Sequence, residues 1–145
     1  MTQTEPWPIK VKWIDGFQFI GYDDGGHSVV MDLPKDKGGG NLGMSPTKVF
    51  LASLAGCTAI DVALIMQKQK QDLKELEVLI SGEQHAGEFP HYFTRFNIKY
   101  VARGKNVSEE ALKKAIQLSD EKYCSVGATL KGKAEIVTSY EIVND

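Results

Sequence analysis

Two cysteine thiols are the side chains of this sequence best suited to chemistry. Cys57 lies inside the apolar run 49–66, and Cys124 follows a charged stretch. A thiolate attacks peroxides and disulfides, whereas a protonated thiol among apolar side chains behaves as a small hydrophobic residue. The pair therefore indicates either a redox site or two packing residues, and the residues alone leave both interpretations open.

The surroundings of the two thiols differ. Cys57 is expected in the middle of a helix, where the helix dipole does not reach, so its activation needs a positive neighbour from elsewhere in the fold. Cys124 is expected at the C-terminal end of a helix, which disfavours a thiolate and favours a resolving role. Asp61 follows Cys57 by one helical turn and shares its face. A carboxylate there must be hydrogen-bonded or paired, and we interpret Asp61 as a structural anchor to the backbone or to a basic side chain.

Other chemical motifs are weak. The sequence has no CxxC motif and no Cys/His cluster with metal-ligand spacing, so we predict no metal and no cofactor. The three histidines, His27, His85 and His91, fall in expected strands or loops and are interpreted as surface or turn residues. The glycine run 38–40 lacks the Gly-Lys-Ser/Thr that completes a phosphate-binding loop.

Composition is that of one ordinary globular domain. The chain has 145 residues, 42% hydrophobic and 25% charged, with a net charge of −2. That balance gives no electrostatic reason to expect nucleic acid as a partner. Asp61 inside the apolar run argues against a membrane span, and the N-terminus has no signal-peptide pattern. We expect one domain over 1–145, with 1–8 as a loose arm, in the cytoplasm, where thiols stay reduced.

The elements that must position these residues follow an α+β order. Alternation and turn dipeptides predict a meander of three strands, a loop over 35–43, a long helix, two strands, a second helix and a last strand. Ser45-Pro46 and Ser108 are expected to begin the two helices. The strands are predicted at 9–14, 17–22, 27–32, 76–83, 92–101 and 134–142, the first helix from 45 to 67–71, and the second from 108 to 123–124. Since residues 49–66 are apolar on nearly all sides, we expect a second copy of the chain to cover the first helix.

The two cysteine segments resemble those of a known family. The run GMSPTKVFLASLAGCTAIDV (43–62) is similar to the central helix of the OsmC family, which includes the organic hydroperoxide resistance (Ohr) proteins. CSVGATLKG (124–132) resembles the segment that carries that family's second cysteine. The segments 16–32 and 38–40 are similar to the OsmC-like branch of the family. The resemblance covers residues 9–142.

The resemblance implies an OsmC-like α+β fold with antiparallel strands, a long central buried helix and an intertwined homodimer. It also implies that Cys57 reduces an organic hydroperoxide, that Cys124 resolves the sulfenic acid, and that a dithiol regenerates the pair. Family peroxidases activate their thiolate with an arginine held by a glutamate. Here Thr47 and Lys48 stand near the glutamate position.

The cation must therefore come from another residue, because the two arginines, Arg95 and Arg103, come late in the chain and Arg95 is expected to face outward. Lys48, or a lysine of the first strand (Lys10 or Lys12), is the candidate, with Thr47 and Asp61 as possible lining residues. Two functions remain open. One is a thiol peroxidase in oxidative-stress defence, and the other is a non-enzymatic dimer that binds a small apolar ligand or senses redox state.

Overall fold

The protein was analysed as a computed structural model that describes residues 7–145. Most of the predicted N-terminal arm therefore lies outside the described residues. The chain divides into two compact units, one ending at Phe50 and the other running from Leu51 to Asp145. The expectation of a single domain stays a prediction.

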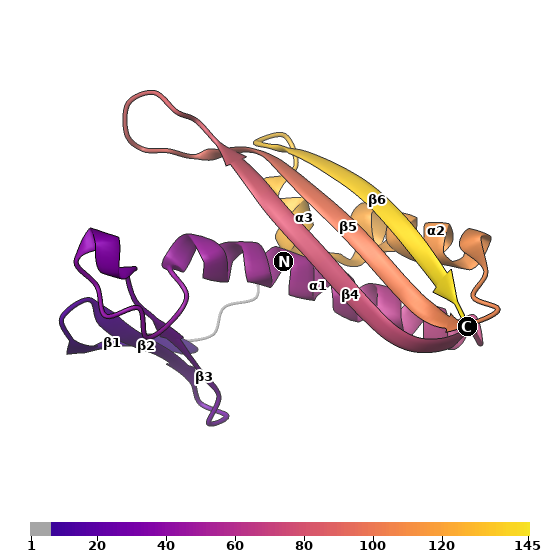
Figure 1. Cartoon of the computed structure of the whole chain (residues 1–145), viewed down its shortest axis with the longest axis horizontal. Helices are drawn as coiled ribbons and strands as arrows, with labels where there is room; N and C mark the ends of the chain where they lie inside the picture. Colours follow the sequence, from indigo (N-terminus) through magenta and orange to yellow (C-terminus); the bar gives the residue numbers. More distant parts are fainter. Residues whose placement is uncertain (1–6) are drawn as a thin grey trace. The chain divides into compact units, whose positions relative to one another are not determined.

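The first unit contains the predicted three-stranded meander (Figure 1). Strands β1 (Ile9–Asp15), β2 (Gln18–Asp23) and β3 (Ser28–Met31) pair antiparallel in the order β1-β2-β3. Gly16 supplies the positive φ of +53° that the first tight turn needs. The loop that follows holds one 3₁₀ turn, η1 (Lys35–Lys37). Its anchor is the buried carboxylate of Asp32, which accepts the N–H groups of Leu33 and Leu42.

Helix α1 (Pro46–Lys68) begins where the sequence predicts. Ser45 Oγ accepts the Lys48 N–H at 3.4 Å, and Pro46 occupies the first helical position. The buried face consists of Leu54, Ala55, Thr58, Val62 and Met66. The single chain covers that face only, since Ile60 and Leu64 remain 64% and 50% exposed, and the covering of the remaining face by a second copy stays a prediction.

By length and hydropathy alone α1 could cross a membrane. Its most apolar window has a mean hydropathy of 2.1, and 28% of that window is buried. Core helices of soluble proteins are often as long and as apolar. Length and hydropathy therefore do not distinguish a membrane-spanning helix from a helix that a partner chain covers.

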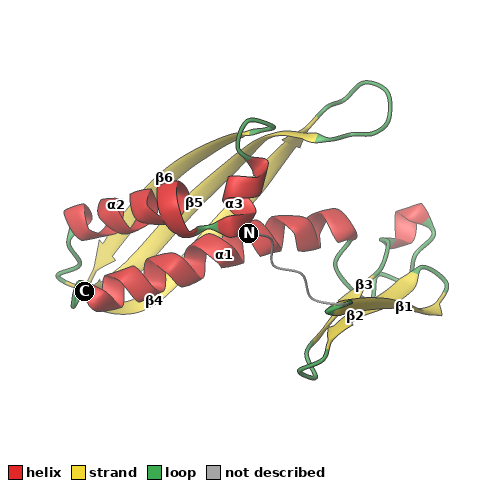
Figure 2. Ribbon diagram, turned by 180° about the vertical axis from the view of Figure 1, so that it is seen from behind, coloured by secondary structure: helices red, strands yellow, loops and turns green. Residues whose placement is uncertain are grey.

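The second unit is a sheet with helices on one face (Figure 2). Its strands, β4 (Asp72–Gln84), β5 (Phe93–Lys105) and β6 (Glu135–Asn144), lie in the order β4-β5-β6. Strands β4 and β5 are antiparallel, but β6 runs parallel to β5, so the prediction of antiparallel strands is wrong for this pair. The physical reason is the helical segment between β5 and β6, which crosses over the sheet and returns the chain in the same direction.

That crossover contains three helical pieces where the sequence predicts one. Helix α2 (Glu109–Leu118) is capped by Ser108, whose Oγ accepts the Ala111 N–H at 3.2 Å. A π-helical turn, η2 (Ser119–Tyr123), continues it, and the short helix α3 (Ser125–Leu130) follows. The core lies between these helices, α1 and the inward side chains of β5, which are Phe96, Ile98, Tyr100 and Ala102.

Candidate functional site

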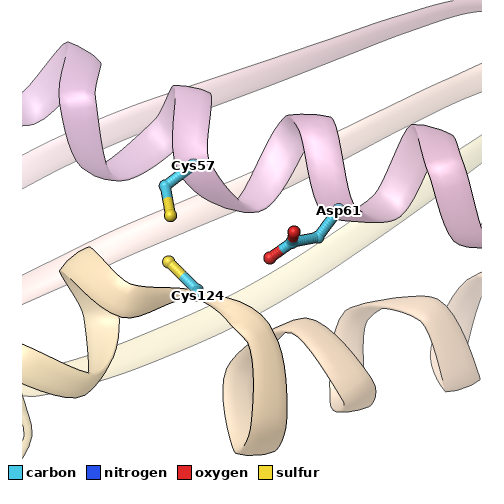
Figure 3. Close-up of side chains that lie close together, drawn as sticks. All are labelled: Cys57, Asp61 and Cys124. Atoms are coloured by element: carbon cyan, nitrogen blue, oxygen red, sulfur yellow. The ribbon is translucent and has the colours of Figure 1, made fainter. Parts of the chain in front are cut away.

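Both thiols and the carboxylate lie together inside the second unit (Figure 3). Cys57 and Asp61 come from one face of α1, and Cys124 comes from the junction between η2 and α3. The two Sγ atoms and one carboxylate oxygen of Asp61 all lie within 4.8 Å of one another. Three of the residues predicted from the sequence therefore form one cluster.

Cys124 is the buried member of the pair. It is 5% exposed, and its Sγ accepts the Gly127 N–H at 3.3 Å, so it caps α3. Burial, and next its hydrogen bond with Cys57, raise the pKa of the Cys124 thiol to about 11, and the nearby Asp61 charge acts in the same direction. The Gly127 N–H works against this shift.

The expected environment of Cys124 is wrong in one respect. The sequence predicts only a helix C-terminus, whereas the residue also stands at the start of α3. The low thiolate character that the sequence predicts for Cys124 does result, but from burial first.

Cys57 is the accessible member. Its thiol is free and partly buried, and it packs against the hydrophobic core from α1. Cys57 is therefore more exposed than Cys124, which is buried.

A chain of buried hydroxyl groups holds the Asp61 carboxylate. Ser119 Oγ donates to Asp61 Oδ2 at 2.9 Å, Thr58 Oγ1 lies 2.9 Å from Ser119 Oγ, and the Tyr100 hydroxyl lies 2.7 Å from Thr58 Oγ1. These groups come from α1, η2 and the central strand β5. The prediction that Asp61 is hydrogen-bonded is confirmed, but the expected kind of partner, the backbone or a basic side chain, is wrong: the carboxylate accepts from a serine hydroxyl that the packing of η2 against α1 brings to it.

The direction of each hydrogen bond in this chain is fixed. A hydroxyl group has one proton, and an ionised carboxylate only accepts. Since Ser119 gives its proton to Asp61, Thr58 must donate to Ser119, and Tyr100 must donate to Thr58. Every donor then points toward Asp61. Burial is the largest cause of the raised pKa of Tyr100, so its hydroxyl keeps the proton it donates.

Sequence reasoning did not find Thr58, Ser119 or Tyr100. The available signal was weak: Thr58 lies one turn after Leu54 on the buried stripe of α1, and a hydroxyl there needs a partner. Tyr100 and Ser119 become its partners only through the tertiary packing of β5 and η2.

The structure also locates the two arginines and the residues at the start of α1. Arg95 and Arg103 alternate with the inward residues of β5 and so lie on the other face of the sheet. There Arg95 Nε is 3.5 Å from Glu83 Oε2, and Arg103 Nε is 3.4 Å from Glu75 Oε2. The outward orientation of Arg95 is confirmed. Thr47 and Lys48 lie in the first turn of α1, within the first unit, and their part in thiol activation stays a prediction.

The molecule is an α+β protein with two neighbouring thiols beside a long apolar helix, and comparisons with known proteins identify its family. The OsmC-like protein family model matches residues 38–139. Protein YhfA of Escherichia coli K12 is 37% identical over 134 residues, covering 92% of this chain and 96% of YhfA. The chain therefore belongs to the OsmC-like family.

Solved structures agree with that fold. A hypothetical protein from Aquifex aeolicus VF5 is 28% identical, with a TM-score of 0.83 over 100% of this chain and 99% of the other. An organic hydroperoxide resistance protein OsmC from Legionella pneumophila is 15% identical, with a TM-score of 0.66 over 95% and 99%. At 15% identity, the similarity to the Legionella pneumophila protein shows a shared fold and nothing further.

Proposed function

We propose that this protein reduces organic hydroperoxides with a thiol pair, Cys57 attacking the peroxide and Cys124 resolving the product. The observation that carries the proposal is the position of the two Sγ atoms, which lie within 4.8 Å of each other. The family includes proteins named for organic hydroperoxide resistance, which supports the same chemistry.

The different environments of the thiols support their separate roles. The raised pKa of Cys124 keeps it protonated at neutral pH, so it is a poor first nucleophile. Cys57 is the more exposed thiol and the one a hydroperoxide reaches. A resolving cysteine must then stand beside the oxidised sulfur, and Cys124 does.

The reaction balances with the two thiols and an external dithiol. The Cys57 thiolate attacks the terminal oxygen of the hydroperoxide, which carries the hydrogen, and the O–O bond breaks. The alkoxide that leaves takes up a proton and becomes the alcohol. The Cys57 sulfenic acid then condenses with the Cys124 thiol, which forms the disulfide and releases water. A dithiol reductant restores both thiols through a mixed disulfide.

A steady-state assay with matched serine variants tests the proposal. Cys57→Ser should abolish consumption of cumene hydroperoxide in the presence of a dithiol. Cys124→Ser should still consume one equivalent and should leave a sulfenic acid on Cys57 that dimedone traps. Equal rates for the wild type and Cys57→Ser would overturn the assignment.

The site geometry also favours a second candidate, a slow redox sensor. Both arginines pair with carboxylates on the far face of the sheet, and Asp61 places a negative charge beside the thiols. If hydroperoxide oxidises Cys57 and Cys124 to the disulfide no faster than it oxidises a free thiol, the result supports the sensor. Oxidation of Cys57 many times faster than a free thiol supports the peroxidase.

We also propose that the protein works as a homodimer in the cytoplasm. On α1, Ile60 and Leu64 are exposed apolar side chains, and on β1, Ile9, Val11 and Trp13 are each more than half exposed. A second copy of the chain would remove these surfaces from water. A reducing compartment would keep both thiols available for turnover.

A further inference from the structure

The geometry points to a metal site: in the reduced protein, Cys57 Sγ, Cys124 Sγ and one oxygen of Asp61 bind a thiophilic divalent cation such as Zn²⁺. The inference does not depend on peroxide reduction, because it concerns the dithiol form of the same cluster. It begins from the three potential ligand atoms, which lie within 4.8 Å of one another.

The spacing suits zinc. Tetrahedral zinc with Zn–S bonds of about 2.3 Å and Zn–O bonds of about 2.1 Å places its ligand atoms about 3.6 to 3.8 Å apart. The three atoms of the cluster need side-chain adjustments of about an ångström to reach that arrangement. Cys57 and Asp61 stand one turn apart on α1, the spacing by which helical metal sites present two ligands to one ion.

The kind of ligand selects the kind of ion. Two thiolates favour zinc and other soft ions over magnesium or calcium, which require oxygen ligands. A set of three protein ligands leaves the fourth tetrahedral position for water or a small molecule, which is the pattern of zinc sites that do chemistry. Binding replaces the protons of Cys57 and Cys124, which pass to solvent, and the bound site carries a net charge of −1.

The groups behind the ligands are those a metal site needs. Ser119 donates to Asp61 Oδ2 and orients the carboxylate, and Gly127 N–H donates to Cys124 Sγ. Thr58 and Tyr100 in turn fix the Ser119 hydroxyl. Such outer hydrogen bonds hold ligands in place and typically change metal affinity when removed.

One consequence links the ion to redox state. A disulfide between Cys57 and Cys124 removes both sulfur ligands, so a bound ion and the disulfide exclude each other. A bound zinc ion should therefore also protect both thiols from alkylation.

Zinc titration of the full chain, kept reduced by a phosphine without oxygen or hydroperoxide, tests the inference. Competition with a chromogenic chelator should show one zinc per chain. Cys57→Ser and Cys124→Ser should each weaken binding by at least about a hundredfold, and Asp61→Asn, whose amide oxygen still accepts from Ser119, by at least about tenfold. Glu121→Gln, an exposed carboxylate of η2, is the matched control and should bind as the wild type does.

Cobalt identifies the ligands independently of affinity. Co²⁺ in place of zinc should give an intense sulfur-to-metal charge-transfer band that is lost in both cysteine variants. Zinc binding no tighter than in the Cys57→Ser/Cys124→Ser double variant would overturn the site, and an unchanged affinity in Asp61→Asn would overturn the three-ligand assignment. The zinc and cobalt measurements do not depend on peroxidase activity. A negative peroxidase assay would therefore contradict the proposed function without contradicting the metal site.

Discussion

At the residue scale, the two thiols should differ in reactivity with pH. The pKa of Cys124 is raised to about 11, chiefly by burial, so its thiolate fraction should grow about tenfold per pH unit between pH 7 and pH 10. Initial alkylation rates of each cysteine, read by mass spectrometry of the labelled peptides, should show this rise for Cys124. Cys57 should be labelled before Cys124 throughout that range. Faster labelling of Cys124 at neutral pH would contradict the role assignment.

The hydroxyl chain predicts unequal costs for its members. Thr58→Val leaves the buried Tyr100 hydroxyl without an acceptor and Ser119 without a donor, so it should destabilise the fold by about 2–3 kcal/mol. Tyr100→Phe only takes a donor from Thr58, and should cost about 1 kcal/mol. Denaturant unfolding of both variants measures the difference.

The double variant is the control for the hydroxyl chain. In the Tyr100→Phe background, Thr58→Val leaves only Ser119 without its partner, because the Tyr100 hydroxyl is already gone. The destabilisations of the two single variants should therefore add up to more than the destabilisation of the double variant. Strict additivity would show that the hydroxyls act independently.

The site residues that could be predicted are those whose neighbouring sequence identifies them, and the residues that were missed meet only through tertiary packing. The cysteines stand in distinctive segments, and the position of Asp61 on the cysteine face follows from helical spacing alone. Thr58, Ser119 and Tyr100 are ordinary residues for a helix, a turn and a strand. Their meeting depends on how β5 and η2 pack against α1, which no periodicity encodes.

At the element scale, the crossover between β5 and β6 shows what local patterns miss. Ser108 and the spaced apolar residues predicted α2 correctly. Helix α3 has only six residues and contains Gly127, and its cap is a cysteine rather than a usual capping residue. The predicted helix over 108–124 covered the residues of α2 and η2 but not α3, and the parallel pairing of β6 with β5 was missed.

Close approach at two glycines of the sheet gives an element-scale prediction. A Cβ at Gly104 would overlap the backbone carbonyl of Asp72, whereas one at Gly82 would meet the ring of Phe93. A ring can rotate away, but a carbonyl cannot move without displacing its strand. Gly104→Ala should therefore destabilise the protein by about 3 kcal/mol or more, and Gly82→Ala by about 1–2 kcal/mol. Urea unfolding compares them, and equal costs would show that the strand adjusts as easily as the ring.

At the scale of the whole molecule, composition and the all-round apolar character of residues 49–66 led to two expectations, one domain and a covering partner. The chain alone buries one face of α1 and leaves Ile60 and Leu64 exposed. Hydropathy does not distinguish a partner chain from a membrane on such a face, because both are apolar surroundings, and only Asp61 within the run argued against a membrane. What covers the exposed face of α1 is a property of the assembly and not of the fold of one chain.

A charge on the exposed face of α1 should separate the proposed dimer. Ile60→Glu and Leu64→Glu together place carboxylates where the second copy would bury the exposed parts of isoleucine and leucine, each worth about 1–2 kcal/mol of transfer free energy. A two-fold interface uses the same patch on both chains, so each substitution counts twice. Sedimentation velocity at micromolar concentration should show a dimer for the wild type and a monomer for the double variant.

The control for this experiment is Lys113→Glu, at an exposed position on α2, which should remain dimeric. The variants should keep the circular dichroism of the wild type, because both substituted side chains of α1 are exposed in the single chain. A wild-type monomer at the same concentration would contradict the dimer and would leave the apolar face of α1 to another partner. In that outcome, binding of the wild type but not the double variant to neutral lipid vesicles would assign the face to a membrane.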